Sequence, residues 1–414
     1  MPGRRRRNLP LLVVFALIAM ALVIYILVIP SVQSFIDHLE ALRAKPRIPI
    51  EALAERIRTA AVEAITAVWF FALGASFGSF LNVIVYRMPA GKSITGSSRC
   101  PFCAVDIKFR DNIPVFGWLM LRGRCRVCRL PISARYPIVE LVAGTFFVLV
   151  LFVETLTGGA NLPFGSRYPF FHGFLGIMFE FKPDMFRLYA YHTFFLWMLF
   201  GFALIKLDGN RLPIMLVILT AVVGLTVPLI WEDMAWNIHR NNYHEVFSIG
   251  ERLKISGIGL VVGVFTGAVV SMILNWQRRP RSRQTYPATV ITLGLVGLYL
   301  GWQASLSVAM LAMIIQVPMT VAARTRDWAK HTPFLMVLFA ATVLHLCIWR
   351  MLSIADWWPS GEVFVAPTIV FYVGLVCLAL TTRLLTPPEV LPSADDSIPT
   401  AIESLEVMPQ EQES

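Results

Sequence analysis

The stretch from Gly78 to Glu140 reads GSFLNVIVYRMPAGKSITGSSRCPFCAVDIKFRDNIPVFGWLMLRGRCRVCRLPISARYPIVE. It holds two C-x-x-C pairs, Cys100/Cys103 and Cys125/Cys128. Two residues between cysteines let a tight turn aim both sulfurs at one ion, and a second such turn completes a tetrahedron. The spacing therefore predicts a zinc site. Because four thiolates close the coordination sphere, we expect a structural rather than a catalytic zinc.

The charge around these cysteines is positive. Four thiolates around a divalent cation leave about −2 on the cluster, and nearby bases offset it. The alternative is a pair of disulfides or four unrelated buried cysteines. By the positive-inside rule, the excess of bases places the segment on the cytoplasmic side of a membrane, and a reducing cytoplasm favours metal over disulfides there. The bases are Arg99, Lys108, Arg122, Arg124, Arg126 and Arg129.

The composition indicates a polytopic membrane protein. The 414 residues are 57% hydrophobic and only 15% charged, which is too apolar for a soluble globular chain. The net charge of +10 lies mostly in short loops between apolar runs, which the positive-inside rule explains without a nucleic-acid partner. Membrane lipid is therefore the expected surrounding, and we expect no binding of nucleic acid.

Hydrophobic runs predict about ten membrane spans with both termini inside. We expect an all-α polytopic membrane bundle with a small cytoplasmic zinc-ribbon-like insertion. The boundary near Gly301 and Trp302 is the weakest in the sequence. The expected spans are residues 9–29, 64–85, 137–152, 187–205, 212–230, 255–276, 287–301, 303–322, 333–352 and 362–381.

The central stretch resembles the N-terminal domain of type IV prepilin peptidases. The resemblance rests on GSFLNV followed by YRMP, on the two C-x-x-C pairs with Asn112-Ile113-Pro114 between them, and on RYPIVE after them. It is dense over residues 74–144 and faint beyond. It implies a membrane-embedded aspartyl protease that cuts prepilin leader peptides at the cytoplasmic face, and N-methylation of the new N-terminus with S-adenosylmethionine as donor. No sequence feature independently specifies a site for that donor.

The positions that match the family's catalytic aspartates carry other residues. An aspartyl protease needs two carboxylates that share a proton, one to activate water and one to protonate the intermediate. The family's first motif, I-D-x-D-x-x-x-L-P-D, aligns with residues 205–214, IKLDGNRLPI, and puts Lys206 at the catalytic place. The second, G-x-G-D, aligns best with YPAT at 286–289 and puts Thr289 there. Both alignments together predict that the dyad is absent.

Two other acids are the candidates for catalytic carboxylates. Asp208 lies two residues beyond the first position, which turns it by about 200° on a regular helix, although a frayed end before Gly209 would reorient it. Asp327 lies in a later loop on the same side of the membrane. The competing interpretation makes both of them ordinary loop residues beside basic neighbours.

These features predict four regions. They are an N-terminal membrane helix and amphipathic segment over 1–63, a prepilin-peptidase N-terminal domain over 64–157 with the four-cysteine insertion at 89–134, a peptidase-like bundle over 158–386 and an acidic disordered tail over 387–414.

Two functions remain open. The first is a member of the prepilin leader peptidase/N-methyltransferase family in the bacterial inner membrane that acts on type IV prepilin-like or pseudopilin substrates in secretion. The second is a pseudoenzyme that serves as a non-proteolytic scaffold for pilin-like helices. A transporter fits poorly, because the spans show no internal repeat and few ionisable residues.

Overall fold

The structure, a computed structural model, describes most of the predicted bundle. The described residues are 20–21, 23–35, 53–163, 182–231, 234, 248–275, 286–355, 358–359 and 365–385. Most of the first expected span, much of the amphipathic segment before residue 53 and the acidic tail over 387–414 lie outside this part.

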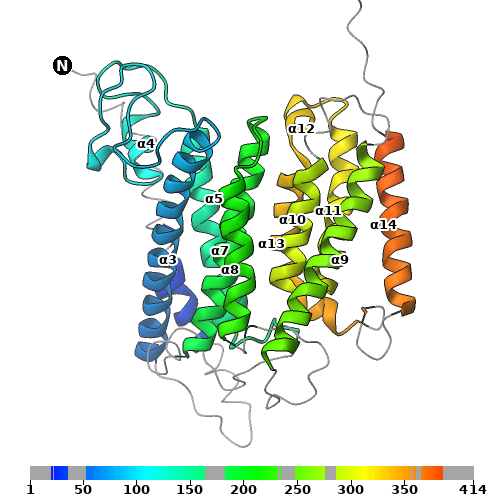
Figure 1. The fold of residues 1–414 in the computed structure, drawn as a ribbon. Coiled ribbons are helices and arrows are strands. Elements are labelled where there is room, and N and C mark those ends of the chain that lie inside the picture. Colours follow the sequence, from blue (N-terminus) through cyan, green and yellow to red (C-terminus); the bar gives the residue numbers. More distant parts are fainter. Residues whose placement is uncertain are drawn as a thin grey trace, which may run out of the picture.

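The described chain is an antiparallel bundle of long apolar helices with an irregular insertion at one end (Figure 1). Seven helices are long and apolar enough to cross a membrane, and three shorter apolar helices accompany them. The long ones are α3 (Leu53–Arg87), α5 with its π-helical end η4 (Arg135–Leu156), α7 (Pro183–Leu207), α9 (Ile249–Asn275), α11 (Trp302–Ala322), α13 (Phe334–Ser353) and α14 (Val365–Leu385). The short ones are Ile24–Phe35, α8 (Ile214–Ile230) and α10 (Tyr286–Leu300).

These ten apolar helices of the described residues confirm the predicted all-α bundle. The predicted boundary between two spans near Gly301 is confirmed. α10 ends at Leu300 and α11 begins at Trp302, with Gly301 between them at φ +87°. A positive φ suits glycine, so this single residue reverses the chain. One helix differs from expectation. α3 begins at Leu53 rather than near Ala64, because no proline lies between Pro49 and the end of the helix at Arg87 to interrupt it.

Glycines allow the closest helix contacts. A Cβ at Gly263 of α9 would lie 2.2 Å from the Leu293 carbonyl oxygen of α10, and one at Gly297 would lie 1.9 Å from the Gly259 carbonyl oxygen. These distances are far below van der Waals contact, so only glycine lets the two backbones touch. The pair α9 and α10 therefore packs as one unit.

The insertion occupies the loop between α3 and α5. It contains two short helices, η3 (Phe109–Asp111) and α4 (Phe116–Leu121), and stands beside the end of α3 rather than over the centre of the bundle (Figure 1). The ends of α7 and α11 and the starts of α8, α10 and α13 lie at this same end (Figure 1). The segments predicted to carry the metal site and the peptidase site thus share one face of the molecule.

Candidate functional site

The two C-x-x-C turns have the same backbone geometry. In the first, the Ala104 N–H donates to the Cys100 carbonyl at 3.0 Å, and in the second the Arg129 N–H donates to the Cys125 carbonyl at 3.1 Å. The residue after each pair is left-handed, with φ 55° at Ala104 and 62° at Arg129. One isolated antiparallel bridge closes each turn. Each half of the site is therefore a tight knuckle that aims two sulfurs the same way.

The four sulfurs meet at one point. The Sγ atoms of Cys100 and Cys128 are 3.8 Å apart and those of Cys103 and Cys125 are 3.9 Å apart, and all four lie within 4.8 Å of one another. Zinc–sulfur bonds of about 2.3 Å give a tetrahedron with edges of about 3.8 Å. The cysteines are free thiols rather than disulfides. The predicted tetrad is confirmed as a group that can hold a metal ion such as zinc.

The backbone prepares the second knuckle for metal. The N–H groups of Cys128 and Val127 hydrogen-bond to the Cys125 sulfur and lower the pKa of its thiol to about 6. A thiolate, not a thiol, is the metal ligand, so the turn favours the ligating form at Cys125, whereas burial and the neighbouring sulfurs raise the pKa of the Cys128 thiol to about 11. Cys100 and Cys125 are buried, whereas Cys103 and Cys128 are half-buried.

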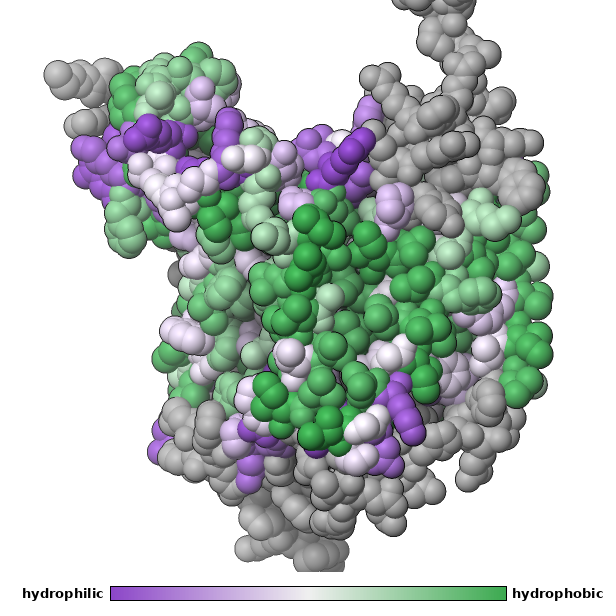
Figure 2. All heavy atoms as spheres, viewed as in Figure 1, coloured by the Kyte–Doolittle hydropathy of each residue, from purple (hydrophilic) through white to green (hydrophobic). Residues whose placement is uncertain are grey.

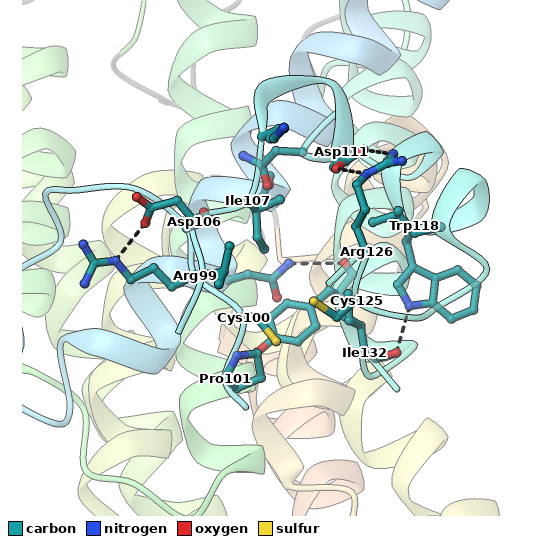
Figure 3. A pocket seen from close by; sticks show the side chains of 18 of the residues that line it. Arg99, Cys100, Pro101, Asp106, Ile107, Asp111, Trp118, Cys125, Arg126 and Ile132 are labelled. Carbon is teal, nitrogen blue, oxygen red and sulfur yellow. Dashed lines mark hydrogen bonds and ion pairs between the residues drawn. The ribbon is translucent and has the colours of Figure 1, made fainter. Parts of the chain in front are cut away.

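Two ion pairs hold the loops around the tetrad (Figure 3). Arg126 of the second knuckle donates to Asp111 of η3 at 2.7 Å, and the Arg126 guanidinium lowers the pKa of the Asp111 carboxyl. Arg99 donates to Asp106 at 2.8 Å across the first knuckle. The Asp111 pair joins the segment between the knuckles to the second knuckle, so it helps to fix their relative position.

The GSFLN and RYPIVE motifs pack against each other. A Cβ at Gly78 of α3 would lie 2.8 Å from the Glu140 Cα and from the Ala143 Cβ of α5, so only a glycine here lets the two helices pack this closely. Asn82 donates from Nδ2 to the Tyr136 carbonyl at 3.2 Å. Glu140 accepts the Val115 N–H at 2.6 Å. The two motifs thus join α3 to α5, and Glu140 connects α5 to the insertion.

A cavity of about 400 Å³ lies between this helix pair and the insertion. Figure 3 shows it from close by, with Cys100 and Cys125 among the side chains that line it and the Trp118 ring, whose Nε1 donates to the Ile132 carbonyl at 2.9 Å, at one side. Its wall mixes acids, bases and aromatic rings, which include Tyr86, Arg87, Asp106, Lys108, Trp118, Tyr136 and Glu140. The wall is mostly apolar with a few charged groups, which is the usual character of a small-molecule pocket.

Asp208, the first candidate catalytic acid, pairs with a base. It caps the C-terminal end of α7, just before Gly209 at φ +72°. Both of its carboxylate oxygens accept hydrogen bonds from the Arg135 guanidinium, one of them at 2.8 Å. Arg135 begins α5, directly after the insertion. Among the described residues, the partner of Asp208 is therefore a guanidinium and not a second carboxylate.

The two positions aligned with the family's aspartates lie at the insertion end of the bundle. Lys206 is in the last turn of α7, and its Nζ donates to the Asn210 carbonyl at 3.1 Å. Thr289 is buried in the first turns of α10, where its carbonyl lies 3.1 Å from the place of a Cβ on Gly267 of α9. Neither side chain can act as a carboxylate.

Asp327, the second candidate acid, is the first residue of the short helix α12 (Asp327–His331). The helix stands at the insertion end of the bundle (Figure 1). The Asp327 side chain lies outside the described part of the structure, so a pairing of Asp208 with Asp327 remains a prediction.

The structure adds a buried polar pair that the sequence did not single out. Glu154, in the π-helical η4, lies 2.7 Å from Nδ1 of His192 in α7, and both side chains are fully enclosed. His345 of α13 is hydrogen-bonded to Ser307 of α11 at 2.9 Å. Both histidines are thus hydrogen-bonded residues of the bundle interior. An acid within an apolar run was the available signal for Glu154.

Comparison with known proteins agrees with this architecture. Residues 72–154 match the family described as Bacterial Peptidase A24 N-terminal domain. The chain is 50% identical over 86 residues to the prepilin leader peptidase/N-methyltransferase of Myxococcus xanthus (strain DK1622), which covers 20% of this chain and 26% of that protein. It is 46% identical over 88 residues to the protein of the same name from Klebsiella pneumoniae, which covers 20% and 39%. No solved structure matches the chain.

A longer alignment reaches beyond the N-terminal domain. The type 4 prepilin-like proteins leader peptide-processing enzyme of Escherichia coli O78:H11 (strain H10407 / ETEC) is 30% identical over 223 residues, which covers 49% of this chain and 79% of that protein. The first two relatives are matched over less than half of their length, whereas this one is matched over most of it. The chain therefore belongs to the prepilin leader peptidase/N-methyltransferase family.

Proposed function

We propose that this protein acts on type IV prepilin-like or pseudopilin substrates and does so without an aspartyl dyad of its own. The observation that carries the proposal is the contrast between the two halves of the site. The N-terminal half contains the cluster of four cysteines, the close packing of α3 on α5 at Gly78, and the cavity. In the other half, Lys206 and Thr289 stand where the family resemblance puts the acids, and Asp208 is engaged by Arg135.

The activity that fits the intact half is N-methylation of the substrate's new N-terminus. S-adenosylmethionine, the donor implied by the family resemblance, supplies an electrophilic methyl group when bound. The cavity lining includes residues whose chemistry suits such a molecule: the aromatic rings of Trp118 and Tyr86 can stack on a nucleobase, and carboxylates such as Asp106 can accept from ribose hydroxyls. The chain's own part is to bind and orient the donor beside the membrane end of the substrate helix.

The tetrad's proposed role is structural zinc. Its four thiolates leave no open position for a substrate, and the cavity wall includes Cys100 and Cys125. Zinc would therefore hold the shape of the cavity wall rather than take part in the chemistry.

The orientation we propose places the insertion and both termini in the cytoplasm of a bacterium, with the bundle in the inner membrane. The insertion end carries many bases, including Arg124, Arg129, Arg211 and Arg324, as the positive-inside rule requires of a cytoplasmic face. A reporter enzyme active only outside the inner membrane, fused after Leu385, should be inactive, and an active fusion would reverse the orientation.

The test of the function uses purified protein in detergent with S-adenosylmethionine. One substrate is a full-length prepilin, and the other is the same protein with its leader already removed. We expect no cleavage of the first and N-methylation of the second, both read by mass spectrometry. Cleavage by the parent that is lost in an Asp208→Asn, Asp327→Asn double variant would show a displaced dyad and overturn the proposal.

The second candidate function is a scaffold that holds pilin-like helices without modifying them. The absence of carboxylates at Lys206 and Thr289 favours it, because a groove for an apolar helix does not need them. Capture of the substrate with neither cleavage nor methylation would select this function.

A further inference from the structure

The insertion is held at the end of the membrane spans by both of its ends. α3 ends at Arg87 and α5 begins at Arg135, so twelve residues separate α3 from Cys100 and six separate Cys128 from α5. In Figure 1 the insertion projects sideways past α3, away from the other helices. A domain tethered in this way cannot leave the level of the bilayer surface, and its effective concentration at the lipid headgroups is high.

The insertion is strongly basic. Residues 89–134 contain eight bases and two acids, and each acid is already paired, Asp106 with Arg99 and Asp111 with Arg126. A zinc–thiolate cluster of about −2 leaves the insertion positive. The bases outside these two pairs are Lys92, Lys108, Arg110, Arg122, Arg124 and Arg129.

Large apolar side chains of the insertion are exposed. Phe109 is 90% exposed, and Val127 and Phe102 are 61% and 59% exposed. Lys108 and Arg110 flank Phe109 in the sequence. Figure 2 shows hydrophilic and hydrophobic residues side by side on the projecting part. Exposed aromatic residues between bases are typical of a surface that lies in a membrane interface, where rings enter the acyl boundary and cations meet phosphates.

We propose that the insertion docks on anionic phospholipid headgroups of the membrane that the chain spans, through Phe102, Lys108, Phe109, Arg110 and Val127, of which Lys108 and Val127 also line the cavity. Charge complementarity selects the occupant: an anionic bilayer carries the opposite charge and is always within reach of the tether. Docking holds the cavity between the insertion and α3 at a fixed height above the bilayer, which is where a membrane-anchored substrate emerges.

The test compares the full-length protein in nanodiscs of phosphatidylglycerol and of phosphatidylcholine. Hydrogen exchange of peptides that cover residues 102–110 and 126–130 reports the docked surface. We expect several-fold slower exchange in phosphatidylglycerol, and we expect a Lys108→Gln, Arg110→Gln double variant to lose the difference. Lys254→Gln is the matched control, because Lys254 is an exposed base in α9 near the opposite end of the bundle.

The integrity of the double variant is checked by its metal content and by unchanged exchange in α3 and α5. A second readout is a Phe109→Trp variant, whose added fluorescence should be quenched by brominated phosphatidylglycerol and spared by brominated phosphatidylcholine. Equal exchange in the two lipids, equal quenching by them, or a difference that survives in the double variant would each overturn the proposal. Protection that needs a second protein rather than anionic lipid would overturn it as well.

Discussion

The Arg135 guanidinium donates to both carboxylate oxygens of Asp208, and this pair joins the first turn of α5 to the C-terminal end of α7. The two residues are 73 positions apart in the chain. Arg135 follows the insertion directly and Asp208 lies two residues beyond Lys206, so the pair connects the metal-bearing half of the molecule to the peptidase-like half.

Arg135→Ala should lower the free energy of unfolding by about 1 kcal/mol. The pair is bidentate, but the Arg135 and Asp208 side chains are 38% and 26% exposed, so water screens part of the attraction. Arg135→Lys should recover only part of the loss, because an ammonium cannot make the same two parallel bonds. Unfolding in detergent, followed by helix content, gives the values. Strict additivity of Arg135→Ala and Asp208→Asn in a double-mutant cycle would show that the two side chains do not interact.

Cys100→Ser or Cys125→Ser should abolish stoichiometric metal binding. Replacing one of four thiolates removes a strong zinc ligand and opens the tetrahedron. Metal content of the purified protein should fall from one zinc ion per chain to a small fraction of that, and proteolysis within the insertion should become faster. Cys347→Ser is the matched control, since Cys347 lies in α13 outside the tetrad. Unchanged zinc in the tetrad variants would refute the zinc assignment.

Glu154→Ala should destabilise the bundle by roughly 1–3 kcal/mol, because it removes the hydrogen bond between Glu154 and His192 in a fully enclosed site. A Glu154→Leu, His192→Phe double variant should be much less damaging, since replacing both members of a buried polar pair by apolar residues of similar size removes the unmet polar atoms. Thermal unfolding of the three proteins in detergent checks the order. A double variant less stable than Glu154→Ala would contradict this account.

Gly263→Ala should weaken the α9–α10 contact by about 1–3 kcal/mol, because its Cβ would overlap the Leu293 carbonyl. Gly257→Ala is a close control on the same helix: nothing lies within 4 Å of its Cβ, so the change should be neutral or gain up to about 1 kcal/mol of helix propensity. The two variants differ only in position. Equal melting temperatures would mean that α9 and α10 do not pack as closely as described.

Local patterns made half of the site predictable from the sequence. The C-x-x-C spacing constrains two sulfurs through a single turn, and the small residues around Gly78 predict close helix packing wherever the partner lies. Arg135 with Asp208 and Glu154 with His192 could not be predicted in the same way. Hydrophobic periodicity says that a helix crosses the membrane, but it does not say which residues of two distant spans face each other.

The start of α3 shows a second limit. The sequence predicts an amphipathic segment that ends at residue 63 and a membrane span that begins at Ala64, yet one helix runs from Leu53 to Arg87 without a break. Charge ends a membrane span but does not end a helix, because the backbone hydrogen bonds continue into water. Boundaries between membrane and surface helix are therefore weaker predictions than the existence of the span itself.

Lys206→Asp alone should not create a protease. The new carboxylate would stand at the end of α7, but Thr289 would still leave it without the second acid that shares its proton. A Lys206→Asp, Thr289→Asp double variant supplies both acids, and any cleavage of a full-length prepilin should need both. Thr289→Asp alone is the control for the second position, and because Thr289 is buried, its folding must be verified by unfolding in detergent. Cleavage by Lys206→Asp alone would mean that a carboxylate elsewhere in the chain already serves as the partner and that Thr289 does not occupy the second catalytic position.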